Sequence, residues 1–372
     1  MTTRIFSHQD LMNDRIDFNQ SVPVIAHGDS WGSFGSLPPW ITGSLFNAMD
    51  FGKDVAVVNY AIPGQLLRDL PDPKKFSKFH MAMTLRGMPN WRALLISGGG
   101  NDLIEWIRRG EGHDIAQRIL RFPAEWLPAD QGPTRFLSQA GWASLCDELL
   151  EAYVQLDALR DRNFAGMDIV THVYDYMTPR FAPALNGVSG PWMAPGFLAA
   201  GIPPTAWQAV ARVLVDWFFD FLEHRVKTRI GGFLVLDTRG GSTPAQPGTS
   251  GTSNDWANEI HLTAAGYKKL AKAKCNATLR YRAQSWTTGA IVDTAAIRAL
   301  AVPMAAAAPK AMAANGALKK KAKTASNGAT AEKAEKPMKR AKAAKATKAA
   351  KAVKAAKAMR PKAGGKTPTL TA

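Results

Sequence analysis

Residues 24–35 read VIAHGDSWGSFG, and this stretch indicates the fold of the chain. Its apolar run stops at Gly28, and the residues that follow are small and turn-prone. A short apolar run that ends in such residues is typical of a buried strand that gives way to a loop. Ser30 is therefore expected at the end of a strand, where it is either a displayed nucleophile or only the residue that ends the strand.

Five apolar runs of this kind are separated by segments with helical periodicity. The runs are rich in Val, Ile and Leu without clean alternation, which is typical of strands buried on both faces of a parallel sheet. Alternating strands and helices predict a three-layer α/β/α sandwich, flavodoxin-like, with a five-stranded parallel sheet. The expected strands are 23–28, 54–62, 92–99, 168–176 and 232–239, and the expected helices are 38–50, 65–86, 103–122, 136–163, 205–228 and 263–282.

The positive charge of the chain is concentrated at one end. The 372 residues include 47 Lys and Arg against 30 Asp and Glu, a net charge of +17. Residues 301–372 hold 18 of the basic and 2 of the acidic residues, which leaves 29 and 28 for residues 1–300. We therefore expect a folded domain at 1–290 with little net charge, followed at 291–372 by a low-complexity Ala/Lys-rich tail that is disordered.

The sequence also indicates the cellular compartment of the protein and whether it needs a cofactor. It has two cysteines and no N-terminal apolar segment of signal-peptide length, and no apolar run reaches the roughly 18 residues that span a bilayer. We expect a cytoplasmic protein with no transmembrane segment. Neither a cluster of metal ligands nor a nucleotide-phosphate loop is evident, so no metal and no cofactor is expected.

Polar residues follow several of the expected strands. Ser30 follows the first, Gly64 the second, Asn101 the third, and Asp255 and His261 come after the fifth. Because ligands bind at the carboxyl ends of the strands in an open parallel sheet, these residues are expected to meet at one edge. A serine hydroxyl needs a neighbouring imidazole to become a nucleophile at neutral pH, and His261 can supply one.

Four short motifs carry a more specific likeness. GDSW with Ser30, IPG with Gly64, GGND with Asn101 and DWANEIH with His261 together resemble the four-block signature of the SGNH (GDSL-type) hydrolases, over roughly residues 20–282. The resemblance implies an esterase that acts on small-molecule or lipid-like carboxylic esters through an acyl-enzyme. Ser30 would be the nucleophile and His261 the general base. The oxyanion hole would consist of the backbone N–H groups of Ser30 and Gly64 and the side-chain amide of Asn101.

The third member of the triad departs from that pattern. The commonest spacing in the family places an aspartate three residues before the histidine, and this chain has Asn258 there. An amide can orient an imidazole but cannot stabilise an imidazolium by charge. We favour Asp255 as the carboxylate, because the intervening residues could loop back to His261, and Glu259 or a dyad without an acid stays open.

Other polar residues near these motifs are expected to be structural. Asp29 and Asp102 adjoin the nucleophile and the oxyanion-hole asparagine, and we expect them to hold loops by hydrogen bonding. His172 is within an apolar run and is expected in the core. His27 could line the site, although a structural role is favoured.

Residues 177–204 are too rich in Pro, Gly and Ala for regular structure. A loop this long in a compact domain is usually functional or disordered. It could form an apolar lid over a pocket, and a mobile surface loop is the alternative. The side chains expected in such a lid are Phe181, Trp192, Met193 and Phe197.

The tail supports a second hypothesis about function. Its composition resembles the C-terminal arms of histone-H1-like bacterial proteins and of some polyester-granule-associated proteins. Lysines that neutralise phosphates release counterions, which strengthens binding to nucleic acid without sequence preference. The alternative is therefore a nucleic-acid- or granule-tethering protein whose hydrolase fold is secondary or inactive, and a solubilising tail without a fixed partner is also open. The four motifs of the globular part favour the enzyme.

Overall fold

The structure is a computed structural model that describes residues 3–33, 43–184, 187 and 189–288. Six strands form one sheet in the order β1-β3-β2-β4-β5-β6, and every neighbouring pair is parallel. The α/β fold with a parallel sheet is confirmed. The strands are β1 (Thr3–Phe6), β2 (Val22–Gly28), β3 (Val55–Asn59), β4 (Ala93–Ser97), β5 (Asp168–His172) and β6 (Phe233–Leu236).

The prediction of five strands was one too few. The additional strand, β1, has only four residues and lies at the edge of the sheet, where Thr3 pairs with Val55 of β3. None of its residues is fully buried, so its sequence lacks the continuous apolar run that marks the central strands.

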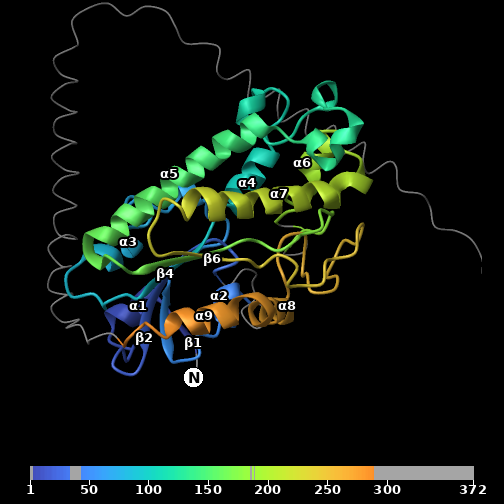
Figure 1. Cartoon of the computed structure of the whole chain (residues 1–372). Helices are drawn as coiled ribbons and strands as arrows, with labels where there is room; N and C mark the ends of the chain where they lie inside the picture. Colours follow the sequence, from blue (N-terminus) through green and yellow to red (C-terminus); the bar gives the residue numbers. More distant parts are fainter. Residues whose placement is uncertain (1–2, 34–42, 185–186, 188, 289–372) are drawn as a thin grey trace, which may run out of the picture. The chain divides into compact units, whose positions relative to one another are not determined.

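Helices cover both faces of the sheet (Figure 1). One face carries α1 (His8–Met12), α2 (Leu45–Ala48), α8 (Ala264–Leu270) and α9 (Asn276–Ala283). The other face carries α3 (Ser77–Thr84), α4 (Gly100–Ile107), α5 (Gln139–Phe164) and α7 (Trp207–Phe221). A short helix, α6 (Ala194–Ala199), belongs to the segment between β5 and α7. The expected three layers are present.

Two predicted helices are shorter than expected. The stretch 65–86 contains a 3₁₀ turn at Leu67–Asp69 and then α3, because two prolines at 71 and 73 interrupt the helical pattern. The helix expected at 103–122 already ends at Ile107 and is followed by 3₁₀ turns.

The remaining helical predictions agree better with the structure. The helix expected at 136–163 is α5, and the one at 205–228 is α7 with a π turn after it. The stretch 263–282 forms α8 and α9, joined by a second π turn. Of the stretch 38–50, α2 occupies the end, and residues 34–42 lie outside the described residues.

Helix α7 shows why these segments pack onto the sheet. Val210, Leu214, Phe218 and Phe221 recur at helical spacing and are all buried. An apolar stripe of this period gives a helix one face to bury against the sheet. Phe218 also lines a pocket beside Ser30, so the packing of α7 positions one wall of that pocket.

A glycine at the end of β2 allows the turn that carries Ser30 to approach β4. Gly28 has a φ of +134°, and a Cβ atom there would lie 2.0 Å from the carbonyl oxygen of Ser97. The next residue, Asp29, donates its N–H to the same oxygen at 2.8 Å. This hydrogen bond fixes the turn of residues 29–33 directly against the end of β4.

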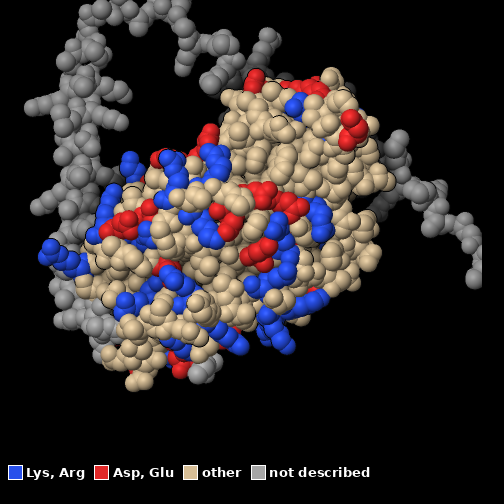
Figure 2. Space-filling model, viewed as in Figure 1, with Lys and Arg blue, Asp and Glu red and all other residues tan. Residues whose placement is uncertain are grey.

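Charges of both signs share the surface of the described residues. Figure 2 shows Lys and Arg interspersed with Asp and Glu over much of one face, with a largely uncharged region over α6. No described helix is long and apolar enough to cross a membrane. Cys146 and Cys275 are buried free thiols. The predicted tail and the boundary at residue 290 lie outside the described residues.

Candidate active site

Ser30 and His261 meet at the carboxyl ends of the strands. The Oγ atom of Ser30 lies 2.7 Å from Nε2 of His261, although the two residues are 231 positions apart in the sequence. Each residue is only 6% exposed. A hydroxyl within hydrogen-bond distance of an imidazole nitrogen is the arrangement that activates a serine as a nucleophile.

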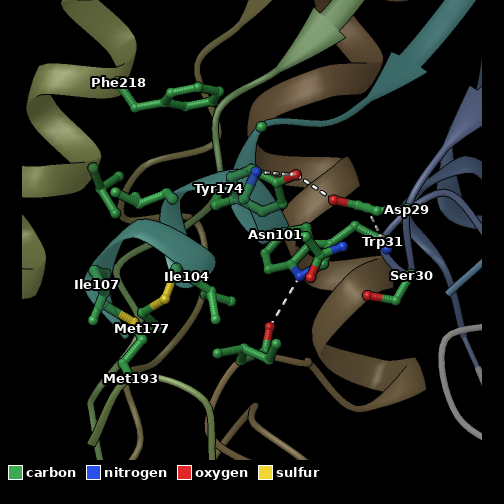
Figure 3. Close-up of a pocket in the computed structure, with 15 residues that line it drawn as sticks. Asp29, Ser30, Trp31, Asn101, Ile104, Ile107, Tyr174, Met177, Met193 and Phe218 are labelled. Atoms are coloured by element: carbon green, nitrogen blue, oxygen red, sulfur yellow. Dashed lines mark hydrogen bonds between the residues drawn. The ribbon is translucent and has the colours of Figure 1, made fainter. Parts of the chain in front are cut away.

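The loop that carries Ser30 is tied to both neighbouring loops. Asp29 accepts hydrogen bonds at Oδ1 from the N–H of Trp31 at 2.9 Å and from the hydroxyl of Ser97 at 2.6 Å. The indole N–H of Trp31 donates to the carbonyl of Ile260 at 2.9 Å (Figure 3). Ser30 is thus held between the end of β4 and the loop of His261.

Asn258 orients the imidazole of His261. Its Oδ1 atom accepts the backbone N–H groups of Ile260 at 3.1 Å and His261 at 2.9 Å, and lies 3.1 Å from Nδ1 of the His261 ring. Because this oxygen only accepts, the ring must carry its proton on Nδ1. Nε2 then has a free lone pair directed at the Ser30 hydroxyl, which is the tautomer a general base requires.

Burial keeps His261 neutral. Desolvation lowers its pKa to about 4, and the negative charge of Asp29 opposes this shift. The ring of Trp192 packs edge to face against the His261 ring, with centroids 5.4 Å apart. The imidazole can therefore accept a proton over the whole neutral pH range, in surroundings from which water is largely excluded.

The sequence favoured Asp255 as the carboxylate that contacts His261. That prediction was wrong, because the Asp255 side chain binds other residues. The Asp255 carboxylate accepts the N–H of Thr243 at 2.6 Å and pairs with Nζ of Lys269 at 2.7 Å. These bonds outweigh partial burial and lower the pKa of Asp255. The residue that reaches the imidazole is Asn258, which sequence reasoning had set aside because it carries no charge.

Glu259, the other carboxylate considered, anchors the segment at 177–204. Its two oxygens accept backbone N–H groups from four residues of that segment, and burial raises the pKa of the group. The bonded residues are Arg180 at 3.1 Å, Met193 at 3.0 Å, Ala194 at 2.8 Å and Trp192. This carboxylate fixes the segment at 177–204, called the covering segment below, to the loop that carries His261.

The segment at 177–204 covers part of the site through some of the expected side chains. Trp192 contacts the ring of His261, and Met193 lines the pocket beside Ser30. Phe197 is fully buried and packs near Trp207, whereas Phe181 is 48% exposed. Two of the four expected side chains are therefore at the site.

Each of the three residues expected in the oxyanion hole has an N–H group without an acceptor in the described part of the chain. The backbone N–H groups of Ser30 and Gly64 have no acceptor within the described part of the chain. The Asn101 amide uses one of its two N–H groups on the carbonyl of Gln65, at 3.0 Å. Asn101 and Ser30 line the same pocket, and Gly64 has the positive φ of +80° that glycine favours.

Asp102 holds the Gly64 loop beside Asn101. Its Oδ2 accepts the N–H of Leu67 at 2.7 Å, and Arg68 lies 3.4 Å from its other oxygen. Burial raises the pKa of Asp102 to about 6, although these bonds oppose the shift. As expected from the sequence, the contacts of Asp102 are those of a residue that holds a loop.

Sequence reasoning missed the residues whose side chains hold the Asp29 carboxylate in place. The Tyr174 hydroxyl donates to Oδ2 of Asp29 and accepts the N–H of Gly100 at 3.1 Å. Ser97 lies 2.9 Å from Nε2 of His172. Ser97 ends β4 and Tyr174 follows β5, but both lie inside the strands expected from the sequence, at 92–99 and 168–176, and neither belongs to a motif. His27 and His172 are buried, as expected for core residues.

An apolar pocket opens beside Ser30 (Figure 3). Its cavity volume is about 30 Å³, within about 530 Å³ of unoccupied space that includes open solvent. Its polar residues lie at the Ser30 end, and its other side is formed by α4, α7 and the covering segment. The apolar side chains that line it are Trp31, Leu103, Ile104, Ile107, Met177, Met193, Val215, Phe218 and Ile260.

Among the described residues, no group of His, Cys, Asp and Glu side chains could hold a metal ion. The site brings together a serine, a neutral imidazole, an orienting amide and the N–H groups of Ser30 and Asn101. Such a set can carry out nucleophilic substitution at a carbonyl group.

Comparisons with known proteins give likeness of structure only. No protein-family model matches the sequence, and no curated protein matches it. Solved structures that resemble it include the lipase Lip_vut3 from a goat rumen metagenome, with 13% identity, a TM-score of 0.38 and coverage of 72% of this chain and 98% of that one. The aryl esterase of M. smegmatis has 12% identity, a TM-score of 0.34 and coverage of 72% and 100%.

A third similar structure is a member of the lipolytic protein G-D-S-L family from Veillonella parvula. It has 12% identity, a TM-score of 0.35 and coverage of 70% of this chain and 96% of that one. At such identities and TM-scores, the function of this chain has to be inferred from its own side chains.

Proposed function

We propose that this protein is a serine hydrolase of the SGNH type that cleaves carboxylic esters through an acyl-enzyme. The observation that carries the proposal is the 2.7 Å separation between Ser30 Oγ and His261 Nε2. Ser30 is the nucleophile, His261 is the general base, and Asn258 is a positioning residue in place of a triad carboxylate.

The reaction follows from these positions. Ser30 Oγ attacks the acyl carbon while His261 Nε2 removes its proton, and the same nitrogen then protonates the leaving alcohol. Water, deprotonated by His261, then attacks the acyl-enzyme. This step releases the carboxylic acid and restores Ser30. Asn258 keeps the other ring nitrogen protonated throughout, so Nε2 remains the nitrogen that exchanges the proton.

Attack turns the carbonyl oxygen into an oxyanion that needs hydrogen-bond donors. The N–H groups of Ser30 and Gly64 and the free amide hydrogen of Asn101 are proposed to supply them. Loss of one such donor typically lowers kcat by about 10²- to 10³-fold. Asp29 and Asp102 support this arrangement by fixing the loops of Ser30 and Gly64.

Turnover of aryl esters tests the proposal. The wild-type protein should hydrolyse p-nitrophenyl acetate or butyrate, and Ser30→Ala should lower kcat by at least about 10³-fold. Ser33→Ala is the matched control, because Ser33 is a buried serine of the same turn whose hydroxyl has no partner within the described residues. Equal inactivity of the wild type and Ser30→Ala with every ester would overturn the proposal.

The alternative function depends on residues 301–372, outside the described residues, and stays a prediction. A tail that binds nucleic acid should retard DNA in a salt-sensitive way, and deletion of 301–372 should abolish the retardation. The two functions are separable, because that deletion should leave ester hydrolysis at Ser30 intact.

A further inference from the structure

The pocket beside Ser30 is polar at one end only. Asp29, Ser30, Asn101 and Tyr174 line the end near the nucleophile, and the hydroxyl of Tyr174 is already bonded to Asp29. Every side chain farther along the pocket is apolar. A group that enters this space loses its water without gaining hydrogen bonds, so the pocket fits a hydrocarbon and not a sugar or a charged group.

The position of His261 indicates which half of an ester enters. The leaving alcohol must lie beside His261, because Nε2 protonates it. Ser30 and Asn101 line the pocket, whereas the His261 side chain is not part of its lining. The chain held in the pocket is therefore the acyl group that stays on Ser30.

Helix α4 sets the depth of the pocket. Asn101 lies at its first turn and Ile107 at its last residue, and both line the pocket. Six residues of α-helix rise about 9 Å, the extent of a linear acyl chain of roughly eight carbons. Figure 3 shows Ile107 across the pocket from Ser30, together with Met177 and Met193.

The far end is closed by the covering segment. A Cβ atom on Gly196 of α6 would lie 2.8 Å from both Cγ2 and the carbonyl oxygen of Ile107, so α6 packs directly on this residue. Met177 and Met193 complete the wall, and their unbranched side chains can adapt to the shape of a flexible chain. The pocket therefore has a floor, formed around Ile107, that limits the length of its occupant.

From these observations, and on the basis of the function proposed above, we infer that the enzyme prefers esters of linear, medium-length acyl groups. Ile107 is the specificity-determining residue at the end of the acyl pocket. Each buried methylene adds about 0.8 kcal/mol of transfer free energy, which corresponds to roughly a fourfold gain in kcat/KM. The gain should continue to about eight carbons and then stop.

The test uses the full chain and p-nitrophenyl esters from acetate to palmitate. For the wild type, kcat/KM should rise with acyl length to a maximum near octanoate. Ile107→Trp fills the end of the pocket and should lower the ratio of kcat/KM for octanoate over acetate at least tenfold. Ile107→Ala deepens the pocket and should move the maximum to longer chains.

Leu198→Trp is the matched control, because Leu198 lies on α6 and is 57% exposed. It adds the same bulk outside the pocket and should leave the octanoate-to-acetate ratio unchanged. Methyl octanoate and octyl acetate then distinguish the two halves of the ester. The inference requires that methyl octanoate be the better substrate.

The possible failures are distinguishable. Hydrolysis of acetate at Ser30 without a preference for length, a ratio that neither Ile107 variant changes, or a preference for octyl acetate would overturn the acyl pocket and leave the hydrolase intact. Inactivity of the wild type with all of these esters would overturn both the hydrolase and the inference that rests on it.

Discussion

Oδ1 of Asn258 lies 3.1 Å from Nδ1 of His261 and also accepts two backbone N–H groups of the same turn. An amide thus occupies the place where a triad would have a carboxylate. It can fix the tautomer and the direction of the ring, but it adds no negative charge to stabilise the imidazolium that forms during attack. Without that charge, His261 is expected to be a weaker base than the histidine of a complete triad.

Asn258→Asp should place a negative charge beside Nδ1 of His261. An opposite charge in contact with an imidazole raises its pKa by about 1–3 units, so the acidic limb of kcat/KM should move to higher pH and kcat at pH 8 should rise. The pH–rate profile of the variant measures both effects. Asn254→Asp is the control, because it adds the same charge to an exposed residue of the same loop. A profile identical to that of the wild type would contradict the assigned role of Asn258.

The wild type should remain active at mildly acidic pH. Burial lowers the pKa of His261 to about 4, so kcat/KM should stay constant from pH 8 to about 5 and fall by half near pH 4. A solvated histidine would instead lose its activity near pH 6.5. A midpoint near 6.5, measured while circular dichroism shows a folded protein, would mean that His261 is not desolvated.

The same shift makes stability depend on pH. Because the folded-state pKa of His261 lies below the unfolded value, the neutral ring contributes its full stability above pH 6.5, and that contribution is lost as the pH falls toward 4. His27, whose pKa burial lowers to about 3, adds to this loss. Urea unfolding between pH 7 and 4 should show a decreasing free energy of unfolding, and His27→Gln should reduce the decrease.

Glu259 should be required to hold the covering segment in place. Its carboxylate accepts backbone N–H groups from four residues, and Glu259→Gln would turn an amide hydrogen toward these donors. The free energy of unfolding should fall by about 2–4 kcal/mol, and protease should cleave the segment at 177–204 sooner. Glu223→Gln, which removes only a surface pair with Lys227, should have a small effect. Equal effects of the two variants would contradict this role.

Gly28 should not tolerate a side chain. A Cβ atom at this position would overlap the carbonyl of Ser97 in a backbone conformation that favours glycine, so Gly28→Ala should displace the turn of Ser30 and lower stability by more than about 2 kcal/mol. Gly110→Ala, where a Cβ atom meets nothing within 4 Å, provides the control. Thermal unfolding of the two variants measures the difference.

The sequence predicts the central strands and the meeting of Ser30 with His261, because continuous apolar runs and strand-end motifs are local signals. It does not predict the partner of the imidazole. Asp255 is held by Lys269, a contact set by the packing of α8, while Asn258 turns inward because its own oxygen accepts nearby N–H groups. Edge strand β1 was missed for a similar reason, since four half-exposed residues carry almost no pattern.

The most direct measurement is covalent labelling with a fluorophosphonate, followed by mass spectrometry of the digested protein. We predict one phosphonyl adduct, on Ser30, that is absent from Ser30→Ala and forms at least about 10²-fold more slowly in His261→Ala. A folded wild-type protein that forms no adduct, or forms it on another residue, would contradict the assignment of Ser30 as the nucleophile.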